Sequence, residues 1–261
     1  MKIGVSNLAW APEAEAQALA LAVAGGASGI EVAPTRIAPW DELTPARLTA
    51  FRDTCSAAGL TIPSLQAIFF GRPDVQLLHN AGSFAAMCEH MHRVGAAAET
   101  LGAGIAVFGA PHNRSRGSGE PVERLSALGD VAREHGIVVG IEPVPVCYGN
   151  DFAAHASELA TLLRVVNHPN VHFHMDCACV QLSGDDPASA ILDTADLLVH
   201  YHAAEPNLGP FNAPVCNHTA CSDALRRIKF DGWVVIEMRQ HGIAAIDEAL
   251  RLVGGAYGEV K

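Results

Sequence analysis

The sequence predicts an α/β protein that folds as a single (β/α)₈ TIM barrel over residues 1–261, and three observations support this prediction. The length of 261 residues is close to the roughly 250 residues typical of such a barrel. Apolar residues make up 49% of the chain and charged residues 17%, as expected for a large buried core. Short β-branched runs alternate with longer alanine-rich stretches, a pattern typical of parallel strands connected by helices.

Eight short apolar runs are the candidate strands. They are rich in the β-branched residues that strands favour, and they are short for helices. Each run is followed by a stretch long enough to hold a helix. The runs cover residues 2–8, 29–32, 61–68, 104–108, 137–141, 171–175, 197–201 and 233–236.

Several of the intervening stretches carry apolar residues at helical spacing with polar residues opposite, so we expect them to form the outer ring of the barrel. Thr44 followed by Pro45 is a typical helix start, and Gly59 and Gly136 follow the last turns of two stretches. No linker-like change in composition divides the chain, which favours one domain. The stretches are residues 45–58, 83–101, 121–135 and 153–166.

An open, doubly wound parallel sheet is the main alternative, because it uses the same alternation of strands and helices. The count of eight units favours the closed barrel. A dinucleotide-binding sheet would also carry a Gly-x-Gly-x-x-Gly turn after its first strand, whereas residues 7–12 read Asn-Leu-Ala-Trp-Ala-Pro. The sequence therefore disfavours a nucleotide cofactor.

The charge and the apolar runs exclude several kinds of partner. A formal charge of −11 would repel a phosphate backbone, so we expect no nucleic acid partner. The apolar run at the N-terminus is too short for a signal peptide, and no run approaches the ~18 residues of a membrane span. Seven cysteines form an odd set that is typical of reduced thiols. We expect a cytoplasmic protein without membrane contact.

Four consecutive strand candidates end in residue types that bind metal ions. In a parallel barrel the carboxyl ends of all strands open onto one face, so these side chains should meet. Three carboxylates and one imidazole at one place would repel one another unless a cation neutralises them or some carboxylates take up protons. The four residues, in strand order, are Glu142, Asp176, His202 and Glu237.

We therefore predict one divalent metal ion bound by these four side chains. The oxygen-rich set favours Mn²⁺, with Mg²⁺ and Co²⁺ as alternatives, and the imidazole keeps Zn²⁺ possible. A single carboxylate after a strand is more often a solvated residue or a helix cap, so the prediction depends on all four together.

Other polar residues near the predicted strand ends are candidate substrate contacts. We expect His112, Glu205, Gln66, Tyr148 and Arg239 to bind substrate, with His112 and Glu205 as the preferred pair. Weaker candidates are Asn7, Glu31, Asn113, Arg114, Asn207 and His218.

His174 and His200 each lie two positions before a predicted ligand, one layer deeper in the barrel. For them we expect hydrogen-bonded core positions and no second metal site.

Four segments carry a resemblance to a known family. They are Gly-Ile-Glu at 29–31, Gly-Ile-Glu at 140–142, His-Ala-Ala-Glu-Pro-Asn at 202–207 and Phe-Asp-Gly-Trp-Val-Val-Ile-Glu at 230–237. Over nearly its whole length the chain resembles the xylose isomerase-like barrel superfamily, particularly the ketose 3-epimerases and hydroxypyruvate isomerases. The resemblance implies that Glu142, Asp176, His202 and Glu237 bind the metal and that Glu142 and Glu237 also move protons. It further implies a homodimer or homotetramer.

The reaction implied by this resemblance is isomerisation or epimerisation of a small keto-sugar or related polyol through an enediolate. A metal that chelates a hydroxyl and the neighbouring carbonyl makes the intervening C–H more acidic. Two carboxylates on opposite sides of that carbon would invert it, whereas one active carboxylate would move the proton between adjacent carbons.

Two positions depart from the pattern of the epimerases. Cys179 and Leu208 stand where that family has a histidine and an arginine that contact substrate. These replacements predict a less polar pocket and an unusual or partly deoxygenated substrate, or a different reaction on the same metal. A dehydratase of a cyclitol or keto acid is therefore the alternative function. A zinc-cluster endonuclease is disfavoured by the acidic charge, and a barrel without turnover is disfavoured by the intact glutamate pair.

Overall fold

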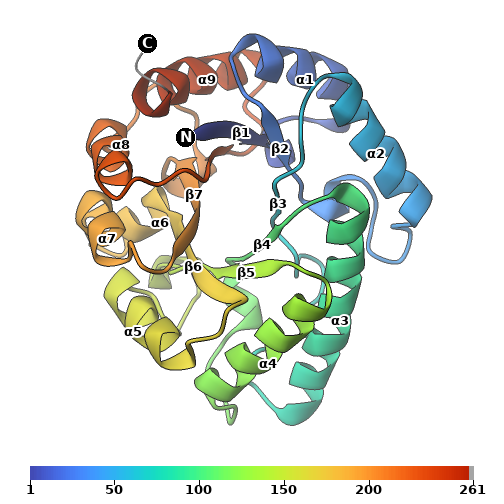
Figure 1. The fold of residues 1–261 in the computed structure, drawn as a ribbon, viewed down its shortest axis with the longest axis vertical. Helices are drawn as coiled ribbons and strands as arrows, with labels where there is room; N and C mark the ends of the chain where they lie inside the picture. Colours follow the sequence, from blue (N-terminus) through green and yellow to red (C-terminus); the bar gives the residue numbers. More distant parts are fainter. Residues whose placement is uncertain (259–261) are drawn as a thin grey trace.

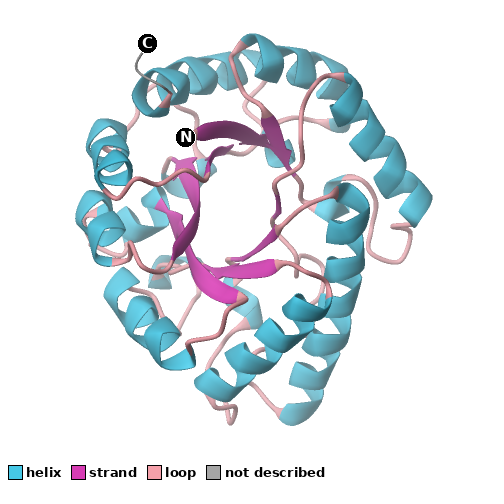
Figure 2. Cartoon of the chain, in the orientation of Figure 1, coloured by secondary structure: helices cyan, strands magenta, loops and turns pink. Residues whose placement is uncertain are grey.

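The protein, described here from a computed structural model covering residues 1–258, is a ring of parallel strands enclosed by helices (Figures 1 and 2). The eight strands alternate with helices along the chain, as the sequence predicts. They are β1 (Lys2–Ser6), β2 (Gly29–Glu31), β3 (Ser64–Leu65), β4 (Ile105–Phe108), β5 (Val138–Ile141), β6 (Val171–Asp176), β7 (Leu198–Ala204) and β8 (Trp233–Glu237).

The strands form a barrel and not an open sheet. Their hydrogen-bonded order is β2-β1-β8-β7-β6-β5-β4-β3. Two isolated parallel pairs, Gly29 with Thr61 and Val32 with Leu65, join β2 to the segment that contains β3. The ring is thereby completed, which confirms the predicted (β/α)₈ barrel and rules out the doubly wound sheet.

The helices form the outer ring (Figure 2). One unit departs from strict alternation, because β6 is followed by two short helices. Among the described residues no helix is long and apolar enough to cross a membrane. The helices are α1 (Glu15–Ala24), α2 (Pro45–Ala57), α3 (Ala81–Leu101), α4 (Pro121–Glu134), α5 (Ala156–Val166), α6 (Cys177–Leu182), α7 (Pro187–Asp193), α8 (His218–Arg227) and α9 (Ile243–Tyr257).

Helix ends follow the predicted capping chemistry. The Thr44 side chain accepts a hydrogen bond from the backbone N–H of Arg47 at the start of α2. Gly59 and Gly136, which follow α2 and α4, adopt φ of 79° and 65°, the left-handed conformation that glycine tolerates best.

The largest error in the predicted elements concerns residues 61–68. Only Ser64–Leu65 are strand, because Ala67 adopts a φ of 52°, which a strand cannot contain. The chain therefore leaves the barrel wall early and continues as a loop at the carboxyl end of β3. Similarly, the predicted helix 153–166 begins only at Ala156, since Ala153 has a φ of 51°.

Candidate metal centre

Three of the four strand-end residues meet around one point at the mouth of the barrel. The registers of β6, β7 and β8 bring Asp176, His202 and Glu237 together, with Asp176 directly opposite His202. The Nδ1 atom of His202 lies 3.1 Å from Oε2 of Glu237 and 3.9 Å from Oδ2 of Asp176. One donor atom from each of the three residues lies within 4.8 Å of the others.

Glu142, which follows β5, joins this group through Asp176. One donor atom from each of Glu142, Asp176 and Cys179 also lies within 4.8 Å of the others. A Cβ atom at position 109 would collide with the Glu142 carboxylate, so Gly109 at the end of β4 leaves room for it. The structure thus brings the four predicted ligands together as two overlapping sets that share Asp176.

The electrostatics of the group fit a divalent cation. Burial raises the pKa of Asp176 well above its usual range, and repulsion from Glu142 and Glu237 raises it further. Burial, followed by repulsion from Glu237, raises the pKa of Glu142 to about 7. The protein itself supplies too little positive charge for these carboxylates. A divalent ion would supply it, and carboxylate oxygens with one imidazole are donors suited to such an ion.

The Glu31 carboxylate contacts Nε2 of His202, the ring nitrogen that does not face Asp176 and Glu237. Its Nε2 atom lies 2.8 Å from Oε1 of Glu31, whose Oε2 accepts a hydrogen bond of 2.7 Å from Ser64. Burial alone would raise the pKa of Glu31 and lower that of His202, but their mutual attraction outweighs burial and shifts both the other way. The Glu31 carboxylate thus lies against Nε2 of His202, and Nδ1 is the ring nitrogen that faces Asp176 and Glu237.

Glu31 is a weak candidate in the sequence, marked by its position at the end of a strand and by the Gly-Ile-Glu segment at 29–31. Its role as the partner of His202 depends on a contact across the barrel between β2 and β7, which no sequence spacing reveals.

His174 and His200 lie beneath the group and are fully buried, as predicted. Nε2 of His200 lies 2.9 Å from the Ser64 hydroxyl. Within residues 1–258 neither ring nitrogen of His174 has a hydrogen-bond partner, which differs from the prediction. Its Nε2 lies 3.9 Å from Oε2 of Glu142. Burial lowers the pKa of His174 well below its usual value, so this ring is neutral beside that carboxylate.

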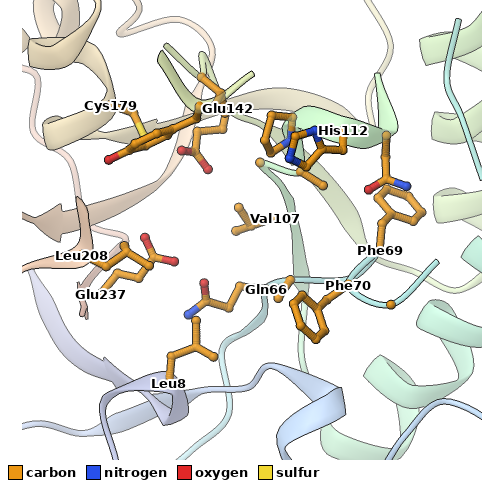
Figure 3. Close-up of a pocket in the computed structure, with 18 of the residues that line it drawn as sticks. Leu8, Gln66, Phe69, Phe70, Val107, His112, Glu142, Cys179, Leu208 and Glu237 are labelled. Carbon is orange, nitrogen blue, oxygen red and sulfur yellow. The ribbon is translucent and has the colours of Figure 1, made fainter. Parts of the chain in front are cut away.

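A cavity of about 520 Å³ opens above the group, and Figure 3 shows the Glu142 and Glu237 carboxylates pointing into it. Four of the five predicted substrate contacts line this cavity. They are Gln66, His112, Tyr148 and Arg239. Cys179 and Leu208, the two departures from the epimerase pattern, line it as well.

Glu205 is the predicted substrate contact that the structure places elsewhere. Its Oε2 accepts a hydrogen bond of 2.8 Å from the backbone N–H of Val215, and its Oε1 lies 2.8 Å from Nε2 of His218. The Tyr257 hydroxyl lies 2.9 Å from the other nitrogen of His218. Because the chain turns after β7, the Glu205 side chain points toward α8 and α9 and supports the loop before α8.

Several weaker candidates also have structural partners. The side chain of Arg114 is fully buried, and its Nη1 donates a hydrogen bond of 2.6 Å to the backbone oxygen of Glu142. Asn113 donates to the backbone oxygens of Arg72 and Val75, both at 2.8 Å. Asn7 accepts from the backbone N–H of Ala33 at 2.8 Å. These contacts hold the loops that surround the cavity.

Comparison with known families gives one match that covers most of the chain. The model of a family described as xylose isomerase-like TIM barrel matches residues 19–254. A ketose 3-epimerase from Arthrobacter globiformis is 32% identical over 123 residues, which are 47% of this chain and 42% of that protein. The chain thus matches less than half the length of this relative.

Solved structures with the same fold cover the chain almost completely. A D-psicose 3-epimerase crystallised in the presence of D-fructose has a TM-score of 0.78 and 20% identity, covering 99% of this chain and 100% of the other. A 3-keto-D-glucoside 4-epimerase from E. coli has a TM-score of 0.79 and 19% identity, covering 98% and 99%. A probable 3-DHS dehydratase from Bacillus anthracis has a TM-score of 0.74 and 17% identity, covering 97% and 98%.

Proposed function

Since this chain belongs to the xylose isomerase-like TIM barrel family, we propose that it is a divalent-metal-dependent isomerase or epimerase of a small keto-sugar or related polyol. The observation that carries this proposal is the pair of carboxylates, Glu142 and Glu237, that face one cavity beside Asp176 and His202 (Figure 3). The ketose 3-epimerase among its relatives supports a sugar substrate.

Glu142, Asp176, His202 and Glu237 would hold the metal ion, with Mn²⁺ as the proposed ion. When bound, the ion acts as a Lewis acid that polarises the substrate carbonyl and stabilises the enediolate. Glu31 keeps the His202 ring in the orientation that this site needs, through the contact at Nε2. Arg114 holds the backbone at Glu142 in place.

The two glutamates would carry the proton. One carboxylate takes the proton from the carbon next to the carbonyl, which leaves an enediolate. If the other glutamate returns a proton to the opposite face of the same carbon, that centre is inverted and the reaction is an epimerisation. If the first glutamate returns the proton to the neighbouring carbon, the reaction is an aldose–ketose isomerisation.

The polar residues on the cavity wall would bind the sugar hydroxyls. The Gln66 amide faces the Glu237 carboxylate in Figure 3, and its nitrogen donates to the Ser6 hydroxyl. Its oxygen could accept, and its second N–H could donate, a hydrogen bond with substrate. We propose His112, Tyr148 and Arg239 as further contacts, because they line the same cavity.

Hydrogen exchange tests this proposal directly. The Mn²⁺-loaded protein is incubated in D₂O with a panel of ketoses, and NMR follows one carbon-bound hydrogen next to the carbonyl. We expect deuterium to enter at this carbon in a substrate. If no ketose in a broad panel exchanges while the protein binds Mn²⁺, the proposal is wrong.

A metal-dependent dehydratase is the second candidate. It is favoured by the apolar and thiol side chains at Leu208 and Cys179, which make the pocket less suited to a fully hydroxylated sugar. Such an enzyme would begin with the same proton abstraction, and the protonated glutamate would then give a proton to the hydroxyl on the carbon β to the carbonyl, which leaves as water. A product lighter by one water, with new ultraviolet absorbance from an enone, would identify it, whereas a product of unchanged mass identifies an isomerase or epimerase.

A further inference from the structure

The cavity has a polar end and an apolar end (Figure 3). At the polar end the carboxylates of Glu142 and Glu237 face the same space as the Gln66 amide. Beyond Val107, near the middle of the view, the opposite end carries the rings of Phe69 and Phe70, with the His112 imidazole on its wall. A substrate whose reacting carbons lie between the two glutamates would therefore extend toward aromatic rings.

We propose that the substrate is a keto-sugar that carries an apolar, ring-shaped substituent at the end remote from its carbonyl, and that the apolar end of the cavity binds this substituent. The inference rests on the proposed function and deepens it by naming the substrate class. A glycoside with an aromatic aglycone is the simplest molecule of this kind.

The side chains that line the cavity away from the carboxylates are mostly hydrocarbon. Those labelled there in Figure 3 are Phe69 and Phe70, and further hydrocarbon side chains line the rest of the cavity, among them Pro73, Pro111 and Val144. A free sugar carries hydroxyl groups along its whole length, and a buried hydroxyl without a partner is unfavourable. An apolar group in this region has no such cost and gains from leaving water.

The polar side chains in the same region are largely occupied by protein partners. Nη2 of Arg72 lies 2.6 Å from the Asp74 carboxylate, and Nη1 lies 2.6 Å from Nδ1 of His90. The Asn113 amide nitrogen donates to two backbone oxygens. The Tyr148 oxygen accepts from the backbone N–H of Asn207 at 2.9 Å, which leaves its O–H free to donate. With Arg72 and Asn113 engaged, Tyr148 and His112 are the polar groups left here for substrate hydroxyls, which is few for a second sugar or a long polyol.

Phe70 offers an exposed aromatic surface at the cavity, on a backbone held by hydrogen bonds. Its side chain is 68% exposed, although large apolar side chains are usually covered. Its backbone is held at both polar atoms, since its N–H donates to the oxygen of Ala67 and its oxygen accepts from Nε1 of Trp40. A flat ring packed on Phe70 would cover this exposed surface without requiring the loop to move.

The size of the cavity agrees with a substituted sugar. Its volume of about 520 Å³ falls within the range of about 300–1,000 Å³ that holds drug-sized ligands. Arg239 also lines it, so an anionic substituent is the competing possibility.

Two matched glycosides test the inference. Calorimetry measures the dissociation constants of the phenyl and methyl β-glycosides of 3-keto-D-glucose for the Mn²⁺-loaded protein. We expect the phenyl glycoside to bind about tenfold more tightly, and Phe70→Ala to remove most of this preference. Val165→Ala on α5 alters a side chain that is 64% exposed and does not line the cavity, so this control should keep the preference.

Several outcomes would overturn the inference. They are equal affinities for the two glycosides, equal weakening of both by Phe70→Ala, or no binding of either. Tighter binding of the methyl glycoside 6-phosphate than of the phenyl glycoside would assign the site to an anionic substituent near Arg239 instead.

Deuterium exchange in the same samples separates this inference from the proposed function. Preference for the phenyl glycoside without exchange would refute isomerase activity on it and leave the apolar site standing. Exchange without any preference would refute the apolar site alone.

Discussion

Two buried clusters of acid and imidazole groups at the carboxyl ends of the strands have opposite character. The metal-ligand cluster, so called for its proposed role, consists of Glu142, Asp176, His202 and Glu237, and the two glutamates line the cavity. The α8 cluster consists of Glu205, His218 and Tyr257, and hydrogen bonds close it within the protein. Both contain a carboxylate beside a histidine, so residue type alone does not distinguish them.

The difference lies in how the charges are balanced. In the α8 cluster one carboxylate faces one imidazole and also accepts backbone hydrogen bonds, which satisfies its oxygens. In the metal-ligand cluster three carboxylates surround one imidazole, and the pKa values of Glu142 and Asp176 are raised. An excess of buried negative charge beside a cavity indicates a site for a cation, whereas a balanced pair indicates a structural support.

The largest expected effect is on activity, which should depend on the metal-ligand cluster and not on the α8 cluster. Glu142→Gln and Glu237→Gln each keep the size of the side chain but remove a proton acceptor. We expect each to lower the rate of proton exchange by about 10²- to 10⁴-fold while the circular dichroism spectrum stays unchanged. Glu205→Gln is the matched control in the α8 cluster and should keep most of the activity. Similar losses in all three variants would remove the distinction.

The next largest effect is on stability, which should depend on the α8 cluster. Glu205→Ala leaves His218 buried without its carboxylate, so we expect the free energy of unfolding to fall by about 3 kcal/mol. Urea denaturation measures this change, and activity per folded molecule should remain near that of the wild type. A loss of activity without a loss of stability would indicate that Glu205 acts on substrate after all.

The pH dependence of stability should differ between the clusters. In chelator-treated protein the raised pKa of Glu142, about 7 against an ordinary 4.5, means that the folded state binds protons that the unfolded chain releases. The free energy of unfolding should therefore fall by about 2 kcal/mol as pH rises from about 5 to 7. Saturating Mn²⁺ should abolish this fall, because the ion replaces the protons.

The α8 cluster changes its protonation state over a higher pH range than the metal-ligand cluster. Burial lowers the pKa of His218, but its contacts with Cys177 and Glu205 raise it to about 9. Its contribution to stability is complete below about pH 6.5 and is lost as pH rises through about 9, with or without Mn²⁺. Thermal melts from pH 5 to 9 measure both windows. The same slope below pH 7 with and without Mn²⁺ would contradict the proposed metal site.

The smallest of these effects concerns Glu31, which supports the metal-ligand cluster from below. Glu31→Gln keeps the size of the side chain but loses the charge that faces Nε2 of His202. We expect Mn²⁺ affinity, measured by calorimetry, to fall by about 10- to 100-fold. Glu205→Gln is again the control and should leave the affinity unchanged. Unchanged affinity in Glu31→Gln would show that His202 is oriented by other contacts.

Much of the fold follows from local sequence patterns. Strand and helix periodicity predicted the eight units, and only the segment 61–68 is seriously misplaced, through the positive φ of Ala67. The positions of Glu142, Asp176 and Glu237 at or just after strand ends also follow from these patterns, and His202 lies two residues before the end of β7, which runs three residues past its predicted end at 201. Their roles as ligands remain a proposal.

The partners of individual side chains were harder to predict from the sequence. Glu205 and Glu31 both lie at or just beyond the end of a strand, yet Glu205 turns toward His218 and Glu31 reaches across the barrel to His202. The direction of a side chain after a strand depends on the path of the loop, which distant segments fix.

The sequence by itself thus determined the order of strands and helices and which residue types stand at the strand ends, because both depend on neighbours along the chain. Only the tertiary structure decided which carboxylates are left without enough positive charge, which are paired, and which end of the cavity is apolar. Those properties depend on contacts between segments that are separated along the chain, from the 13 residues between Glu205 and His218 to the 136 residues between Ser64 and His200.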